Sequence, residues 1–388
     1  MQLRSKLPDI GTTIFTTMSK LALDHEAINL GQGFPDFNPS EKLINYVYKA
    51  MQQGHNQYPY MPGVAPLRQV IHNKVKTLYK ADYNVDTEIT VTSGATEAIM
   101  AAMLASVSQG DEVIVIEPSY DAYEPDVLLA GGIPIRVRMM PPDDNHQTFW
   151  VDWNQIADAI TKKTKLIVLN FPNNPTGAIM SEQDLDAIET LVSGTDILLL
   201  SDEVYEHIVF EPNKHLSIAS RPELFERSFV ISSFGKTTHT TGWKVGYCCA
   251  PKKLSDELRK IHQFLVFTVP SPFQYALAEY TEDSSTYLQL PNFYQQKRDL
   301  LKLGLDQTKF KTLSCPSTFF LLADYREISN KNDKEFAIWL TQNHGVTVIP
   351  VSAFYNQSQE LPDLGLVRFC FAKQDDTLTQ AVDLLKNV

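Results

Sequence analysis

Short apolar runs alternate along most of the chain with longer stretches that have the period of a helix. The runs cover residues 89–92, 113–116, 135–137, 166–169, 197–200, 229–231 and 245–247. Several of them are apolar at every position, which is typical of strands that are covered on both faces. Helical periodicity falls between the runs, for example at 97–107, 153–160 and 182–192, where Ser181 and Asp184 indicate a helix start. The alternation predicts βαβ units around a mostly parallel, seven-stranded sheet.

The pattern changes after about residue 284. From there, helical stretches and apolar runs are mixed, with helices expected at 293–305, 334–342 and 376–386 and strands at 318–323, 346–349 and 366–371. This mixture predicts a second, smaller α+β unit. We therefore expect a large domain at 41–283, and a small domain made of 284–388 together with 1–40, whose first part forms an arm over the site. A length of 388 residues favours two units, because a single hydrophobic core rarely grows so large.

Charge and composition argue against several classes of protein. The chain has 34 Lys and Arg residues against 46 Asp and Glu residues, a net charge of −12, whereas binding to a nucleic acid backbone needs a basic surface. The sequence shows neither a secretory leader nor an apolar run of the ~18 residues that span a membrane. The cysteines do not have the spacing of a zinc site or of a disulfide framework, and the nine histidines form no HExxH motif, so no metal site is expected. We expect a reduced, cytoplasmic protein.

Chemically distinctive residues follow four of the predicted strands. The turn at 93–96 opens a helix, where free N–H groups and the helix dipole favour an anion. The segment at 170–177 holds two prolines and a glycine, a composition suited to holding an Asn amide in one direction. Asp202 comes at the end of a buried strand, where a carboxylate needs a partner, and Tyr205 follows it. Lys236 follows a further strand, beside hydroxyl groups.

Each of these features also has a purely structural explanation, as a helix start, a tight turn or an internal ion pair. Three common motifs are absent. Gly235-Lys236-Thr237 is not a phosphate-binding P-loop, because Val230 occupies the position of its first glycine. No GxGxxG turn and no GxSxG esterase signature occurs. The remaining set of an anion-binding turn, a fixed Asn, an acid near a Tyr and a lysine suits pyridoxal phosphate, a phosphorylated cofactor that forms a Schiff base with lysine.

These motifs, in this order, resemble the fold-type I, class I aminotransferases, which use pyridoxal 5'-phosphate (PLP). The nearest branch contains the kynurenine and glutamine aminotransferases and the bacterial methionine aminotransferases. The similarity runs from about Pro8 to the C-terminus. It implies an α/β fold with a large, helix-flanked sheet and a smaller α+β domain from both chain ends. It also implies a homodimer with its active sites at the subunit interface.

The resemblance assigns roles around the cofactor ring. Lys236 would form the Schiff base, and Asp202 would pair with the pyridinium nitrogen. Tyr205 and Asn174 would hydrogen-bond the ring hydroxyl oxygen, and Tyr120 would stack on the ring face.

The resemblance also places the cofactor phosphate. It would lie among Ala95, Thr96, Ser233 and Lys244, with Tyr58 reaching it from the partner subunit. Many family members have arginine at position 244. Lysine still supplies positive charge there, but as a point donor and not as a fork.

For the substrate, the resemblance assigns the α-carboxylate to Arg368 and places Gly33 beside the amino acid. Phe15, Tyr60 and Phe267 would add aromatic surface, although they could instead pack at the dimer interface. The segment at 263–274 lacks the arginine with which aspartate-specific relatives bind a second carboxylate. The expected reaction is ping-pong transamination of an apolar, aromatic or sulfur-containing L-amino acid, such as Met, Phe, Tyr, kynurenine or Gln, with a 2-oxo acid.

Two other functions share this fold. One is a PLP-dependent cysteine-S-conjugate β-lyase or carbon–sulfur lyase, which breaks a different bond of the substrate. The other, more remote, is a non-catalytic, aminotransferase-like module of a transcription regulator. Such regulators carry a DNA-binding domain before the cofactor fold, and here the family motifs begin within about the first fifteen residues.

Overall fold

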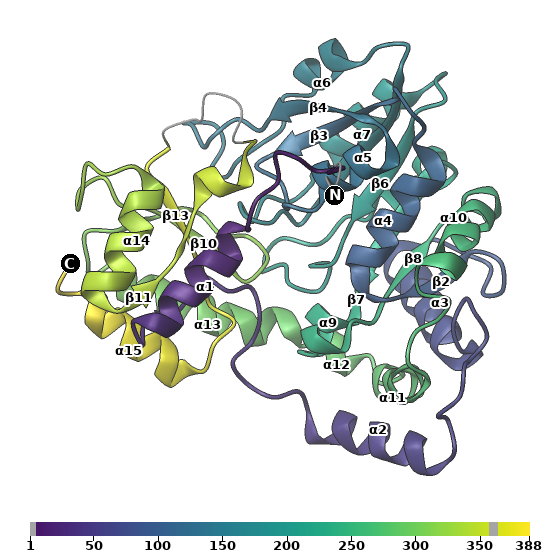
Figure 1. Cartoon of the computed structure of the whole chain (residues 1–388), viewed down its shortest axis with the longest axis horizontal. Coiled ribbons are helices and arrows are strands. Elements are labelled where there is room, and N and C mark those ends of the chain that lie inside the picture. The colour runs from purple at the N-terminus through teal and green to yellow at the C-terminus, as the bar shows by residue number, and fades with distance from the viewer. Residues whose placement is uncertain (1–4, 357–363) are drawn as a thin grey trace, which may run out of the picture.

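Seven strands form the main sheet, and their directions confirm the mostly parallel arrangement that the sequence predicts (Figure 1). The computed structural model describes residues 5–356 and 364–388. In spatial order the strands are β2 (Ile89–Thr92), β8 (Gly246–Cys249), β7 (Ser228–Ser233), β6 (Leu198–Asp202), β5 (Thr164–Asn170), β3 (Glu112–Glu117) and β4 (Ile133–Arg138). Strand β8 is antiparallel to both of its neighbours, while the pairs from β7 to β4 are parallel. The carboxyl ends of the other strands therefore meet at one edge of the sheet.

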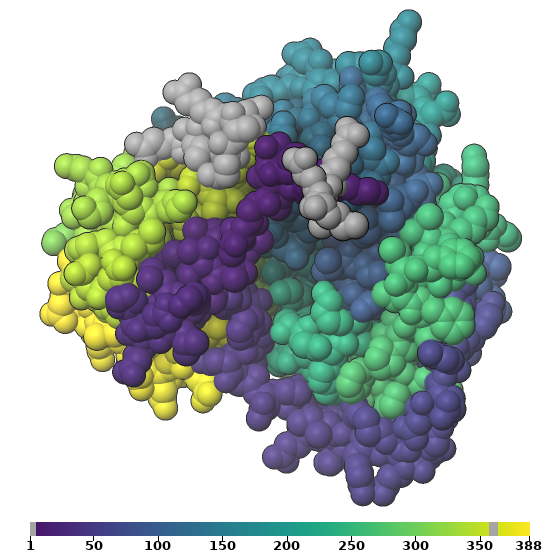
Figure 2. Space-filling view, in the orientation of Figure 1, coloured from purple at the N-terminus to yellow at the C-terminus, as the bar shows by residue number. Residues whose placement is uncertain are grey.

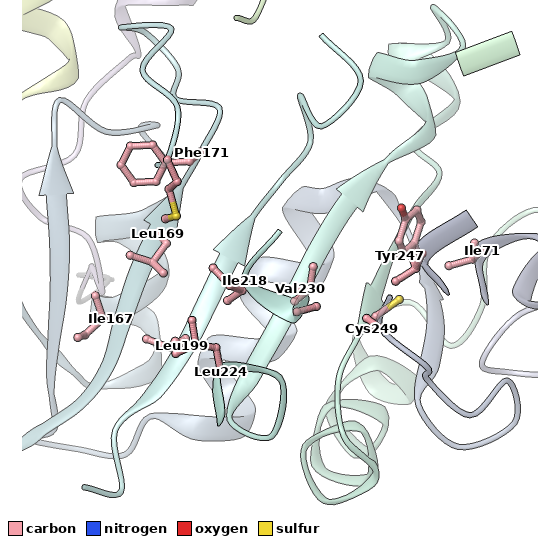
Figure 3. Close-up of a cluster of buried hydrophobic side chains, with 14 of the residues drawn as sticks. Ile71, Ile167, Leu169, Phe171, Leu199, Ile218, Leu224, Val230, Tyr247 and Cys249 are labelled. Carbon is pink, nitrogen blue, oxygen red and sulfur yellow. The ribbon is translucent and has the colours of Figure 1, made fainter. Parts of the chain in front are cut away.

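Helices cover both faces of this sheet, because successive side chains of its strands point to opposite faces and are apolar on both. Ile167, Leu199 and Val230 lie in a core with α3, α6 and α7, part of which Figure 3 shows. Their chain neighbours Val168 and Leu200 lie in a second core with α4, α5 and α10 on the opposite face. The helices and turns of this part are α2 (Glu41–Gln52), α3 (Ala65–Tyr79), α4 (Gly94–Ser106), α5 (Tyr123–Ala130), α6 (Trp153–Ala159), α7 (Glu182–Val192), η1 (Ile218–Ser220), α8 (Pro222–Phe225), α9 (Phe234–Thr237), η2 (Thr241–Trp243), α10 (Lys252–Leu265), α11 (Ser271–Thr281) and α12 (Ser285–Leu288).

A second, antiparallel sheet lies beside the first and has the order β12-β13-β10-β9. Its strands are β12 (Ile349–Pro350), β13 (Leu366–Cys370), β10 (Phe320–Asp324) and β9 (Lys311–Thr312). A short parallel pair, β1 (Ile28–Asn29) and β11 (Val346–Thr347), joins the N-terminal segment to it. The surrounding helices are α1 (Ile14–Asp24), α13 (Leu290–Leu305), α14 (Asp333–His344), η3 (Val351–Phe354) and α15 (Asp375–Leu385). Both ends of the chain thus contribute to this part of the structure.

Two of the strand predictions are wrong in detail. The run at 346–349 is not one strand, because its first half pairs with β1 and its second half with β13. The run at 318–323 begins to pair only at Phe320, since Thr318 has a left-handed backbone (φ 63°) that interrupts an extended chain. The domain boundaries at 41–283 and 284–388 stay a prediction. Within the described ranges, every helix is too short or too polar to cross a membrane.

Helices α13 and α15 approach each other closely at Gly304. A Cβ built there would lie 2.4 Å from Val382 Cγ2, on the facing helix. Helix propensity alone would favour alanine by ~0.5–1 kcal/mol. We expect the clash to dominate, so that Gly304→Ala lowers the free energy of unfolding by about 1–3 kcal/mol.

Urea unfolding of Gly304→Ala, Val382→Ala and the double variant tests this contact. The double variant should be more stable than the sum of the single effects predicts, because the smaller residue at 382 makes room for the new methyl group. Gly11→Ala is the matched control, since its Cβ would have nothing within 4 Å. Equal effects at Gly304 and Gly11 would contradict the close approach.

Candidate active site

A cavity of about 420 Å³ lies at the carboxyl edge of the main sheet, between this sheet and β13. Twelve of the residues predicted from the sequence line it: Phe15, Gly33, Ala95, Thr96, Tyr120, Asn174, Asp202, Tyr205, Ser233, Lys236, Lys244 and Arg368. They come from strand ends of the main sheet, from β13 and from the N-terminal segment. In Figure 2 that segment, in purple, crosses between the yellow-green C-terminal part and the blue and teal part of the molecule. The parallel strands bring residues that are far apart in the chain into one cavity.

Lys236 projects into the cavity from α9, directly after strand β7. Its Nζ donates to Gly33 O at 3.0 Å and lies 5.5 and 5.1 Å from the ring centroids of Tyr205 and Phe319. Burial among these rings lowers the pKa of Lys236 to about 8, and the positive charge of Arg368 adds to the lowering. Near neutral pH, part of the Lys236 population is therefore the neutral, nucleophilic amine.

Asp202 ends strand β6 and is buried. Its Oδ2 accepts from Tyr123 Oη at 2.7 Å and its Oδ1 from the backbone N–H of Val204 at 3.2 Å. Burial raises the pKa of Asp202 to about 6, although these hydrogen bonds and the charge of Lys236 oppose the rise. A carboxylate of this kind is stabilised by a cationic partner in the cavity.

The turn between β2 and α4 forms one end of the cavity. The amides of Ala95 and Thr96 lie in the first turn of α4, where a helix has no internal acceptor for its N–H groups. Lys244 Nζ donates to Thr96 Oγ1 at 3.1 Å. Gly246 permits this arrangement, because a Cβ there would lie 2.8 Å from Ala95 N. Helix amides and a lysine directed at one point suit a phosphate group.

Arg368 lines the cavity from β13, with an exposed fraction of 1%. Its Nη1 donates to Asn174 Oδ1 at 2.6 Å and its Nη2 to Gly31 O at 2.8 Å, while Nε has no partner among the described residues. Both acceptors are neutral. Burial lowers the pKa of Arg368 to about 10, which leaves it charged at neutral pH. A charged, buried fork without a bonded anion suits a carboxylate ligand.

Aromatic rings surround the Arg368 guanidinium. Its central carbon lies 3.8 Å from the ring centroid of Phe320, 4.9 Å from that of Phe354 and 5.4 Å from that of Phe15. The rings stabilise the cation by cation–π contact and limit its movement. Phe320 was not predicted from the sequence, although it comes from a predicted strand.

Other lining residues were also missed. Asn170, at the end of β5, lines the cavity; its Oδ1 accepts from Asn174 N and its Nδ2 donates to Asp202 O, so it connects two predicted residues. Asp121 lines the cavity beside Tyr120 and has a pKa raised by burial. Nothing in the sequence around Asn170 or Asp121 distinguished either residue from its neighbours as part of the site.

Three predicted residues lie outside the cavity of the single chain. Tyr58, Tyr60 and Phe267 are exposed, and the rings of Tyr58 and Phe267 are in contact with a centroid separation of 5.4 Å. Their roles at the site remain predictions.

Comparisons with known proteins agree with this geometry. The family model for aminotransferase class I and II matches residues 25–385. Methionine aminotransferase of Escherichia coli (strain K12) is 47% identical over 386 residues, which are 99% of this chain and 98% of the relative. Kynurenine–oxoglutarate transaminase of Dictyostelium discoideum is 35% identical, over 97% of this chain and 94% of the relative. A solved Escherichia coli structure, described as identifying a methionine aminotransferase function, superimposes with a TM-score of 0.96 at 46% identity and full coverage of both chains.

The lowered pKa of Lys236 predicts an unusual labelling profile. In cofactor-free protein, its reaction with a small amine-directed reagent should reach half its maximal rate near pH 8, because only the neutral amine reacts. A lysine side chain free in water, with a pKa of ~10.4, is still mostly protonated there. Peptide mapping by mass spectrometry at each pH gives the profile of Lys236 and those of the exposed lysines from one sample.

Arg368→Met provides the internal check on this profile. Removal of the nearby positive charge should move the midpoint of Lys236 to higher pH. A wild-type midpoint equal to that of the exposed lysines would contradict the burial of this amine.

Proposed function

The chain belongs to the class I and II aminotransferase family, and we propose that it binds pyridoxal 5'-phosphate in the cavity at the carboxyl edge of the main sheet. The donors present fit this group. The amides of Ala95 and Thr96 and the ammonium group of Lys244 would hold its phosphate, with Ser233 beside them. Burial destabilises the charged form of Asp202, and a protonated ring nitrogen of the cofactor would stabilise it as a cationic partner.

The remaining contacts with the cofactor ring would come from three other residues that line the cavity. Asn174 and Tyr205 line the cavity next to Asp202 and would hydrogen-bond the ring hydroxyl oxygen. Tyr120 would stack on one ring face, and burial raises the pKa of its phenol to about 12, which keeps it neutral. Bound there, the cofactor would withdraw electron density from the substrate carbon that loses its proton.

Lys236 and Arg368 would then act on different parts of the substrate. Arg368 would orient the α-carboxylate through its two Nη groups. Lys236 would hold the cofactor covalently and, as a free amine, would move the proton at the substrate Cα. The observation that carries this proposal is that the amine, the acid, the anion-binding turn and the buried arginine all line one cavity. Ping-pong amino transfer to a 2-oxo acid follows.

The walls of the cavity favour a substrate with an uncharged side chain. Phe15, Phe34 and Phe320 line it, and Arg368 is the single arginine among the described lining residues. Asp121 adds a carboxylate that would repel an acidic side chain. We infer that Met, aromatic amino acids, kynurenine and Gln are preferred amino donors, a range that includes the methionine and kynurenine named for two of the relatives.

A panel of amino donors tests both the activity and the substrate class. With one 2-oxo acid as acceptor, kcat/KM for Met or Phe should exceed that for Asp roughly a hundredfold, because an unpaired side-chain carboxylate would be buried. Lys236→Ala should lose ~10²–10⁴-fold in turnover from proton transfer alone. A clear preference for Asp would overturn the substrate assignment. Release of pyruvate from a β-substituted cysteine without any acceptor would favour the lyase alternative.

We further propose that the active protein is a homodimer in the cytoplasm. Phe264 has an exposed fraction of 86% and Tyr58 of 83%; Tyr60 and Phe267 are exposed as well, and the rings of Tyr58 and Phe267 are in contact. Exposed aromatic groups of this kind are typical of interfaces, and two-fold dimers are the commonest assembly. The four cysteines are free and buried, in keeping with a reducing compartment.

Phe264→Glu should weaken this dimer at least tenfold, because it places a charge in the proposed apolar interface. Sedimentation velocity across a dilution series measures the change. Leu303→Glu is the matched control, since Leu303 is also exposed (65%) but lies on α13. Equal dissociation of both variants, or a wild-type monomer, would contradict the assignment.

A further inference from the structure

The loop at 31–34 forms part of the cavity wall and is held by hydrogen bonds from cationic side chains. Arg368 Nη2 donates to Gly31 O at 2.8 Å, and Lys236 Nζ donates to Gly33 O at 3.0 Å. In the proposed reaction Lys236 binds the cofactor covalently, so its bond to Gly33 O is not a permanent means of fixing the loop. Arg368 has further N–H groups for a carboxylate and can keep its bond to Gly31 O, provided that the loop stays in place.

A third cation, Lys373, holds the same loop without lining the cavity. Its Nζ donates to Phe34 O at 2.7 Å, lies 3.5 Å from Gln32 O, and lies 5.0 Å from the centroid of the Phe34 ring. The residue has an exposed fraction of only 3%. Its hydrogen bonds go to backbone carbonyls and not to a carboxylate. Burial of an ammonium group costs free energy, and its hydrogen bonds to the loop offset part of that cost. Because the donor is charged, these bonds are stronger than neutral ones.

The residues after Lys373 extend this anchor. The backbone N–H of Gln374 donates to Asp36 Oδ1 at 2.6 Å, and Thr377 Oγ1 donates to Asp36 Oδ2 at 2.8 Å. The start of α15 therefore fixes the chain just beyond the loop. Lys373 is five residues after Arg368 in the chain. One short segment therefore carries both the arginine proposed to bind the carboxylate and the lysine that holds the loop beside this arginine.

We propose that Lys373 is a positioning residue of the substrate site. Its ammonium group fixes the loop at 31–34 from outside the cavity, and so keeps Gly31 O as the acceptor that orients Arg368. The inference rests on the proposed function, because it assumes that Arg368 binds the substrate carboxylate. Lys373 touches neither substrate nor cofactor in this role.

Lys373→Met tests the proposal in the holoenzyme. The KM for the amino donor and the Kd of a small monocarboxylate inhibitor should rise roughly tenfold, as expected when a charge-assisted hydrogen bond that orients a binding group is lost. Turnover at saturation should change much less. Amide hydrogen exchange should accelerate at Gly31 and Gln32, whose N–H groups now donate to Asn29 Oδ1.

Lys297→Met is the matched control. Lys297 is a buried lysine nearby (7% exposed), but it donates to Lys373 O and Asp375 Oδ1 and not to the loop. Local exchange at 31–34 and a KM effect confined to Lys373→Met support the proposal. The same effects in both variants, or none in Lys373→Met, overturn it. Should Lys373→Met not fold, Lys373→Gln is judged by the same criteria.

These measurements also separate this proposal from the proposed function. If the wild-type enzyme transfers no amino groups, the proposed function fails, and hydrogen exchange still decides whether Lys373 fixes the loop. If the wild-type enzyme is active and Lys373→Met binds the inhibitor normally, only the role of Lys373 fails.

Discussion

The common direction of the strands in the main sheet is the constraint on which the site depends. Parallel strands end at one edge, and each of β2, β3, β5, β6 and β7 delivers a side chain or an amide to that edge. The antiparallel strand β8 contributes from its start, where Lys244 precedes it. Parallel strands also need crossover helices, and these cover both faces of the sheet. The same topology that gathers the functional groups therefore removes water from beneath them.

This removal of water shifts the ionisable groups of the cavity in a consistent way. Burial favours the neutral form of each group, so the pKa of Lys236 falls and that of Asp202 rises. Arg368 is also affected, but its ordinary pKa is so high that it stays charged. The site thus combines a lysine able to lose its proton with an arginine that keeps its own. This difference suits a reaction in which one cation moves a proton and the other only binds.

Much of the main sheet could be predicted from the sequence, because its strands are apolar runs and four of them are followed by a distinctive segment. Helix α7 was predicted at its observed bounds, since Ser181 and Asp184 form a capping box. Asp202 ends its strand, and Asn174 and Lys236 lie in the short segments that follow theirs, which is why the sequence pattern indicated them. Their roles were assigned from the family resemblance. The short strands β11 and β12 were not separated, because a change of pairing partner leaves no mark on hydrophobicity. Phe320 and Asp121 were missed because their function comes from distant neighbours across the cavity.

The parallel pair β1–β11 joins segments from opposite ends of the chain. During synthesis, Ile28 and Asn29 leave the ribosome long before Val346 and Thr347 exist. The early segment must remain without this strand partner until β11 has been synthesised, and an unpaired strand is prone to aggregation. Formation of this two-stranded sheet therefore has to wait for β11, and a nascent chain stalled before residue 346 would lack the strand that pairs with Ile28 and Asn29.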